Sequence, residues 1–196
     1  MILNQLVDSL KCLPGVGPKS ALRLAYFLLQ RDRNSAQKLS ISISNALEKL
    51  NACSLCNNFT ELDICNLCGS ASRDNSLLCI VEMPTDLLMM EQTNTYNGQY
   101  YILMGKLSPL DGIGPTELNL KKLIERIKKS NFKEIILATN FTSEGNATAE
   151  YISTLLKAFP YKVTRISRGL PMGGEIEFVD SGTLAQALED RKIIDI

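Results

Sequence analysis

Two cysteine pairs, Cys53-Ser-Leu-Cys56 and Cys65-Asn-Leu-Cys68, divide the 196-residue chain into parts of different character. Each pair can wrap one side of a tetrahedral ion, and the eight intervening residues bring the two pairs together. Thiolates fill all four positions and leave none for water. We therefore predict one structural Zn²⁺ per chain, whose binding energy folds the otherwise polar segment 53–76.

Other uses of these cysteines are a pair of redox Cys-x-x-Cys motifs or ordinary buried thiols. Two pairs so close together favour zinc. Cys12 and Cys79 lie outside the pattern, in apolar surroundings, and are predicted to be plain core residues. No export signal opens the sequence, so six cysteines indicate a reducing compartment, and we expect a cytoplasmic protein.

Before the cysteines, residues 13–20 read Leu-Pro-Gly-Val-Gly-Pro-Lys-Ser and must turn between two segments of helical periodicity, 2–10 and 19–30. A third helix follows, with Asn34 or Ser35 predicted as its cap. The pattern of two helices around a glycine-rich turn predicts a helix-hairpin-helix, which grips the DNA backbone without reading bases.

The chemistry of this turn suits an anion. Gly15 and Gly17 permit backbone geometry closed to other residues and leave main-chain N–H groups uncovered next to a helix start. Lys19 and Arg23 stand four residues apart, on one helical face, and add two cations. We therefore predict that these four residues bind DNA.

Two alternatives apply to the turn. A nucleotide P-loop is excluded because Pro18 separates Gly17 from Lys19, which breaks the required Gly-Lys pair. The second alternative is a structural turn that binds nothing. Charge favours DNA, because residues 1–50 carry seven basic and three acidic side chains, net +4, whereas the whole chain is neutral. One hairpin contacts few phosphates, so we expect an oligomer that binds by avidity.

After residue 77, strands and helices alternate. The expected strands are 78–82, 100–104, 134–138 and 162–166, and the expected helices are 85–92, 117–130 and 145–158. The strands are continuously apolar, which indicates a parallel sheet covered on both faces. No apolar run is long enough to cross a bilayer, and the absence of histidine removes every Ser-His, Cys-His and His-metal mechanism.

Acidic residues follow two of these strands, where ligands bind in open α/β sheets. Glu82 and Asp86 follow the first strand, and Glu144 follows the third. Carboxylates gathered there can hold Mg²⁺ for phosphoryl transfer. They can equally form an acidic patch for a basic protein partner, or be solvated loop carboxylates.

Residues 77–170 resemble the Toprim domain of topoisomerases and bacterial primases. Catalytic members carry Asp-x-Asp-x-Glu-Gly-Glu, and the matching positions here are Asn140, Thr142, Glu144 and Asn146. Only one of these side chains is acidic, and amides or a hydroxyl are poor substitutes for the anionic oxygen that Mg²⁺ prefers. The resemblance therefore implies a Toprim scaffold with no catalytic residue.

The whole chain resembles the RecR family of bacterial recombination mediators, over essentially its full length. The runs that carry the resemblance are Cys-Leu-Pro-Gly-Val-Gly-Pro-Lys-Ser at 12–20, Gly-Lys-Leu-Ser-Pro-Leu-Asp-Gly-Ile-Gly-Pro at 105–115, Ile-Leu-Ala-Thr-Asn at 136–140, and Gly-Leu-Pro-Met-Gly-Gly-Glu at 169–175. The implied fold is α+β, with a helix-hairpin-helix region over 1–52, a zinc finger over 53–76, an α/β Toprim domain over 77–172, and a C-terminal segment over 173–196.

The resemblance also implies a function without enzyme chemistry. Family members act in recombinational gap repair with RecO and RecF, help load RecA onto single-stranded DNA, and commonly form a tetrameric ring. It implies DNA contact at Lys19 and Arg23, and RecO contact near Glu82, Asp86 and Glu144. The C-terminal segment 173–196 is expected to contain a Walker B-like strand, at 175–180, and a helix, and to take part in oligomerisation. The alternatives are a Mg²⁺-dependent Toprim nuclease or primase, and a pure protein-interaction adaptor.

Overall fold

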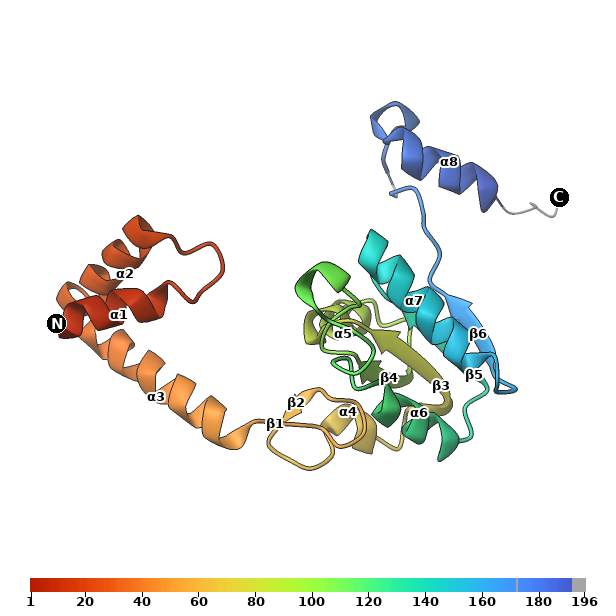
Figure 1. Cartoon of the computed structure of the whole chain (residues 1–196), viewed down its shortest axis with the longest axis horizontal. Coiled ribbons are helices and arrows are strands. Elements are labelled where there is room, and N and C mark those ends of the chain that lie inside the picture. Colours follow the sequence, from red (N-terminus) through yellow and green to blue (C-terminus); the bar gives the residue numbers. More distant parts are fainter. Residues whose placement is uncertain (172, 192–196) are drawn as a thin grey trace. The chain divides into compact units, whose positions relative to one another are not determined.

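The computed structural model describes residues 1–171 and 173–191 of the chain. It divides into two compact units (Figure 1). The first holds Met1–Asn51 with Thr60–Leu62, and the second runs from Ala52 to Phe59 and from Asp63 onward. Each unit is described by itself.

The first unit contains three helices: α1 (Ile2–Leu10), α2 (Pro18–Gln30) and α3 (Arg33–Lys49). The first two helices lie side by side and are joined by the glycine-rich turn (Figure 1). The two fully buried side chains of α2 are Ala21 and Ala25, whose small size lets neighbouring helices approach closely.

The start of α3 differs from the expected one. Asp32 is its N-cap, and its carboxylate accepts a hydrogen bond of 3.0 Å from the backbone N–H of Ser35. The prediction that Asn34 or Ser35 caps this helix was wrong by two or three residues, since Asp in this position satisfies a free N–H group of the first turn equally well.

The first unit leaves many large apolar side chains in solvent. Cys12 is also exposed, because it lies in the turn beyond Lys11, the C-cap of α1. The prediction that it is a core residue was therefore wrong. The largest exposed apolar side chains of α2 and α3 are Leu22, Tyr26, Phe27, Leu29, Leu39, Ile41, Ile43 and Leu47.

The second unit is built on a four-stranded parallel sheet, which confirms the predicted sheet. Its strands are β3 (Asp74–Val81), β4 (Gly98–Ile102), β5 (Glu134–Ala138) and β6 (Lys162–Arg165), in the spatial order β4-β3-β5-β6. Strand β3 begins four residues earlier than predicted because its polar start still pairs with β4.

Helices cover both faces of the sheet. Helices α6 (Leu120–Lys128) and α7 (Ser143–Leu156) pack on one face, against Leu78 and Ile80 of β3. Helix α5 (Pro84–Gln92) packs on the other face, where Cys79 is fully buried as predicted. Alternate residues of the second half of β3, Leu78–Val81, thus enter two different cores, which is why this half of the strand is apolar throughout.

Four short elements lie between α3 and β3 and in the loop after β4. Strands β1 (Asn51–Ala52) and β2 (Phe59–Thr60) form a two-stranded sheet, and α4 (Asn66–Gly69) follows the second cysteine pair. The short 3-10 helix η1 (Pro109–Asp111) lies in the loop between β4 and α6.

The C-terminal part forms helical turns where a strand was expected. Ile176–Phe178 is a 3-10 helix, η2, and helix α8 (Ser181–Glu189) follows, capped by Asp180. The predicted strand at 175–180 was therefore wrong, because this segment pairs with no strand of the described sheet and closes local turns instead. No helix in the described ranges combines the length and apolarity that crossing a bilayer requires.

Candidate functional site

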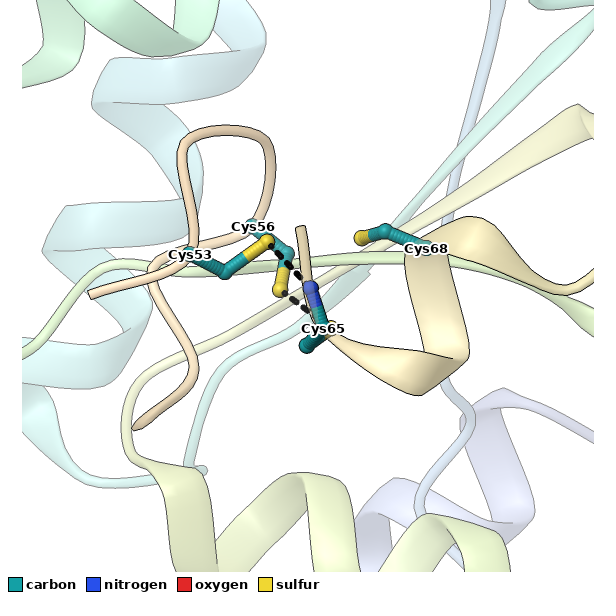
Figure 2. A group of neighbouring side chains, drawn as sticks. All are labelled: Cys53, Cys56, Cys65 and Cys68. Atoms are coloured by element: carbon teal, nitrogen blue, oxygen red, sulfur yellow. Dashed lines mark hydrogen bonds between the residues drawn. The ribbon is translucent and has the colours of Figure 1, made fainter. Parts of the chain in front are cut away.

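The four cysteines of the two pairs converge at one point of the second unit (Figure 2). All four Sγ atoms lie within 4.8 Å of one another, and the Sγ atoms of Cys56 and Cys65 are 3.5 Å apart. Zinc–sulfur bonds of about 2.3 Å in a tetrahedron separate the sulfurs by about 3.8 Å. The sulfur positions therefore fit a four-thiolate metal ion.

Backbone N–H groups and burial act in opposite directions on these thiols. The N–H of Cys65 donates to Sγ of Cys53 at 3.3 Å, and the N–H of Asn58 donates to Sγ of Cys56 at 3.4 Å. Burial raises the pKa of Cys53, but N–H groups led by that of Cys65 more than offset it and lower the value to about 7. Burial raises the pKa of Cys65 to about 11. Four such sulfurs ionise together only around a cation, so the cluster suits a bound metal.

A polar network fastens the cysteine segment to the sheet. Asn57 donates through Nδ2 to the carbonyl oxygen of Ile102 at 2.8 Å and accepts from Lys122 at 2.6 Å. Arg126, one turn further along α6, donates to the carbonyl oxygens of Leu55 and Tyr100 at 2.7 and 2.6 Å. The loop that contains the first cysteine pair is thereby held by strand β4 and helix α6.

The glycine-rich turn of the first unit has the geometry of an anion cradle. Gly15 has φ +77°, and a Cβ added at Gly15 or Gly17 would meet no atom within 4 Å. The first backbone bond of α2 runs from Ala21 to the carbonyl of Gly17, so the N–H groups before it stay free of the helix ladder. Lys19 and Arg23 are both exposed. The sequence-predicted residues thus lie together around one helix start.

The acidic residues in the described part of the second unit do not gather into a cluster that could hold a metal. Glu82 is only 3% exposed and accepts two hydrogen bonds from Asn140, from the backbone N–H to Oε1 at 2.9 Å and from Nδ2 to Oε2 at 2.7 Å. Asn146 accepts through Oδ1 from Arg165 at 2.7 Å. Both amides that replace Toprim carboxylates are thus used in internal hydrogen bonds. Within the described ranges, the cysteine cluster is the one group of ligand side chains close enough to hold a metal.

The two other acids are accessible. Glu144 lies in the first turn of α7 and forms an ion pair of 3.4 Å with Lys106, each side chain being more than a third exposed. The backbone N–H of Glu144 lowers the pKa of this carboxyl most, and Lys106 lowers it further. Asp86 is partly buried and accepts from the backbone N–H of Met83 at 2.8 Å, at the start of α5. Of the three acids predicted to bind a partner, Asp86 and Glu144 have accessible carboxylates, whereas the carboxylate of Glu82 is buried against Asn140.

Three groups of residues in the second unit were missed by sequence reasoning. Lys122 and Arg126 dock the cysteine segment, Lys106 pairs with Glu144, and Arg165 lies beside the Toprim loop. Their partners are backbone carbonyls or side chains distant in sequence. A lone cation in a polar stretch gives no signal of such a contact.

Three family models match the chain in sequence order. The model described as "RecR, helix-hairpin-helix" matches residues 3–47, the Toprim domain model matches 76–167, and the model described as "RecR, C-terminal" matches 169–192. A helix-hairpin-helix, a four-cysteine cluster and a Toprim domain on a parallel sheet define the class: a DNA-binding Toprim protein of the recombination-repair type.

The chain belongs to the RecR family, because the three matches together reproduce the family's domain architecture. This family works in DNA repair and recombination as a mediator rather than as a classical enzyme. DNA binding and oligomerisation are properties of the family.

One solved structure is also similar, that of the SBP FpvC in complex with Ni²⁺ from P. aeruginosa. The match has 20% identity and a TM-score of 0.29, and it covers 84% of this chain. The chain spans 47% of the length of that structure, and the likeness supports no conclusion about fold, ligand or function.

Proposed function

We propose that this chain is a non-enzymatic recombination mediator that assembles as a homo-oligomeric ring on DNA. In this proposal it acts with RecO and RecF to help load RecA onto single-stranded DNA at gaps. The observation that carries the proposal is the open helix-hairpin-helix turn of the first unit, with two exposed cations at the start of α2.

DNA contact is proposed at the turn. The N–H groups at the start of a 13-residue helix point outward and carry the positive end of the helix dipole. Gly15 and Gly17 leave room for a phosphate to approach, because no heavy atom would meet a Cβ at either position. Lys19 and Arg23 then add charge without any means of reading bases, which predicts binding that is independent of sequence.

Assembly into a tetramer is proposed on two grounds. A single hairpin contacts few phosphates, so a protein with no net charge needs several hairpins on one particle for useful affinity. The first unit also exposes apolar side chains that a subunit contact would bury; Phe27 is 49% exposed and Ile43 51%. The C-terminal segment 173–196 is proposed as a second contribution to subunit contacts.

A basic partner, RecO in this proposal, is expected to meet the acidic side chains at the Toprim loops. Asp86 and Glu144 supply the accessible carboxylates, each at the start of a helix. Glu82 is proposed to contribute indirectly. Its two hydrogen bonds with Asn140 set the position of the loop that leads to Glu144. Electrostatic complementarity of this kind contributes mainly specificity and association rate.

The metal is proposed to be Zn²⁺ in a structural role. Cys53, Cys56, Cys65 and Cys68 would hold it, and the ion would supply folding energy to residues 53–76. Magnesium-dependent cleavage or priming is disfavoured, because the Toprim positions carry amides that already bind Glu82 and Arg165.

The test is reconstitution on gapped DNA coated with single-strand-binding protein. Addition of the chain to RecO and RecF should speed RecA filament formation, and the Lys19→Gln/Arg23→Gln variant should not. Cleavage or primer synthesis that depends on Mg²⁺ and disappears in Glu144→Gln would overturn the proposal in favour of a Toprim enzyme.

A further inference from the structure

Two arginines at the end of β6 share one aromatic ring. The Cζ atoms of Arg165 and Arg168 each lie 4.8 Å from the centroid of the Phe141 ring. Phe141 follows strand β5 and is 39% exposed, so the ring and its two guanidinium groups form a cationic surface at the carboxyl edge of the sheet. This surface belongs to the second unit and shares no residue with the hairpin.

Neither arginine of this pair forms an ion pair within the described residues. Arg165 donates through Nη2 to neutral acceptors, Oδ1 of Asn146 at 2.7 Å and the carbonyl of Asn140 at 3.3 Å. Its Nε is buried and finds no acceptor in residues 1–171 and 173–191. Burial lowers the pKa of Arg165 and Arg168 lowers it further, while the buried carboxylate of Glu82 acts in the opposite direction. Two cations held together without a carboxylate in direct contact favour the approach of an anion.

A groove of about 360 Å³ opens beside these side chains. Its lining is completed by Ile166, Ser167, Gln186 and Asp190. Arg168 donates through Nη1 to Oε1 of Gln186 at 2.9 Å, and Nε2 of Gln186 donates to the carboxylate of Asp190 at 3.1 Å. No carboxylate of the described residues comes within 4 Å of either guanidinium, Asp190 included. The N–H groups of Arg168 that do not contact Gln186 stay available to a ligand.

We propose that Arg165, Arg168 and Phe141 bind a phosphodiester of single-stranded DNA, with the neighbouring base packed on the arginine–aromatic surface. Guanidinium groups match phosphate oxygens in geometry and charge. Unstacked bases pack on exposed aromatic rings and on guanidinium planes, and this contact tolerates any base. An acidic peptide would use the two cations but not the exposed ring, so the combination favours a nucleic-acid strand. The proposal goes beyond the hairpin contact and stands on different residues.

The test uses the full chain and fluorescein-labelled oligo(dT)12, with binding followed by anisotropy over a series of salt concentrations. Arg168→Gln and Phe141→Leu should each weaken binding at least threefold. The slope of log affinity against log salt should fall by about 0.7 in Arg168→Gln, which loses one phosphate contact, and stay unchanged in Phe141→Leu. Lys129→Gln, which removes an exposed charge from the end of α6, should bind like the unaltered chain.

The outcomes separate this site from the hairpin. Lower affinity for the oligonucleotide in Arg168→Gln and in Phe141→Leu supports the proposal, whether or not Lys19→Gln/Arg23→Gln also loses affinity. Loss in the hairpin variant alone overturns the proposal and leaves the hairpin function standing. An equal effect of Lys129→Gln would show a general effect of charge rather than a site and overturn it. Binding of dTMP as tight as that of the oligonucleotide, or a defect confined to an acidic protein partner, would also overturn it.

Discussion

Asn140 closes over the carboxylate of Glu82 with two hydrogen bonds, from its backbone N–H at 2.9 Å and from its side-chain amide at 2.7 Å. In a catalytic Toprim domain the position of Asn140 is acidic. Here the amide donates to the buried acid instead of sharing a cation with it. With an amide at position 140, the polar groups of this loop pair with one another by hydrogen bonds and do not provide carboxylates for a metal.

Replacement of Asn140 by Asp should destabilise the protein in a pH-dependent manner. Two carboxylates at hydrogen-bond distance raise the pKa of the pair in the folded state above the unfolded values of about 4. A raised carboxyl pKa lowers the free energy of unfolding at neutral pH, and the loss disappears as the pH falls through the folded pKa toward the unfolded one. We expect a loss of about 1–3 kcal/mol at pH 7.

Urea unfolding at pH 7 and pH 4.5 measures this effect. The control Asn140→Leu removes the amide without adding charge and should show a loss that is nearly the same at both pH values. A loss in Asn140→Asp that did not shrink at pH 4.5 would contradict the charge interpretation.

Gly145→Ala should be destabilising by about 1–3 kcal/mol, as expected for overpacking of a tight site. A Cβ at this position would lie 2.7 Å from Oε1 of Glu82 and closer still to the carbonyl oxygen of Asn140. Thermal unfolding checks the prediction. Gly169→Ala serves as control, because a Cβ there would meet no atom within 4 Å; equal melting temperatures for the two variants would refute the steric argument.

Cys53→Ser should reduce the bound zinc from about one ion per chain to well under half, because an alcohol oxygen is a poor replacement for a thiolate. Metal content by mass spectrometry and hydrogen exchange over residues 53–76 give the readout. The loss should extend to the contacts of Asn57 with Ile102, since the same loop carries both. Cys12→Ser, at an exposed cysteine outside the cluster, should retain its metal.

Lys19→Gln combined with Arg23→Gln should weaken DNA binding at least tenfold near 0.1 M salt and reduce the salt slope by about 1–2. The reduction should be the same for unrelated DNA sequences, because phosphate contacts carry no base code. Anisotropy titrations measure both quantities. Lys38→Gln removes one exposed charge from α3 of the same unit and should change affinity little; a loss restricted to particular sequences would argue for base reading.

Glu144→Lys should impair RecO binding by about tenfold while leaving DNA affinity within twofold, because it reverses an accessible charge that pairs with Lys106. Surface plasmon resonance with immobilised RecO measures the first quantity. Glu150→Lys places the same charge change on an exposed position of the same helix and should have little effect. Parallel loss of both activities in Glu144→Lys would indicate a folding defect.

Local patterns in the sequence determined much of this protein. The alternation of strand and helix patterns placed all four strands of the main sheet, and Glu134–Ala138 was predicted to the residue. The spacing of Cys53, Cys56, Cys65 and Cys68 predicted the cluster that the structure brings within 4.8 Å. Such features depend on residues near one another in the chain, so they can be read from it directly.

Tertiary structure alone decided which polar side chains remain available. Glu82 and Glu144 look alike in the sequence, yet one is buried under Asn140 and the other is accessible. Arg165 and Arg168 meet Phe141 only because β5 and β6 lie next to each other in the sheet. The availability of a charge depends on partners that are distant in sequence, and their approach is set by packing rather than by any local pattern.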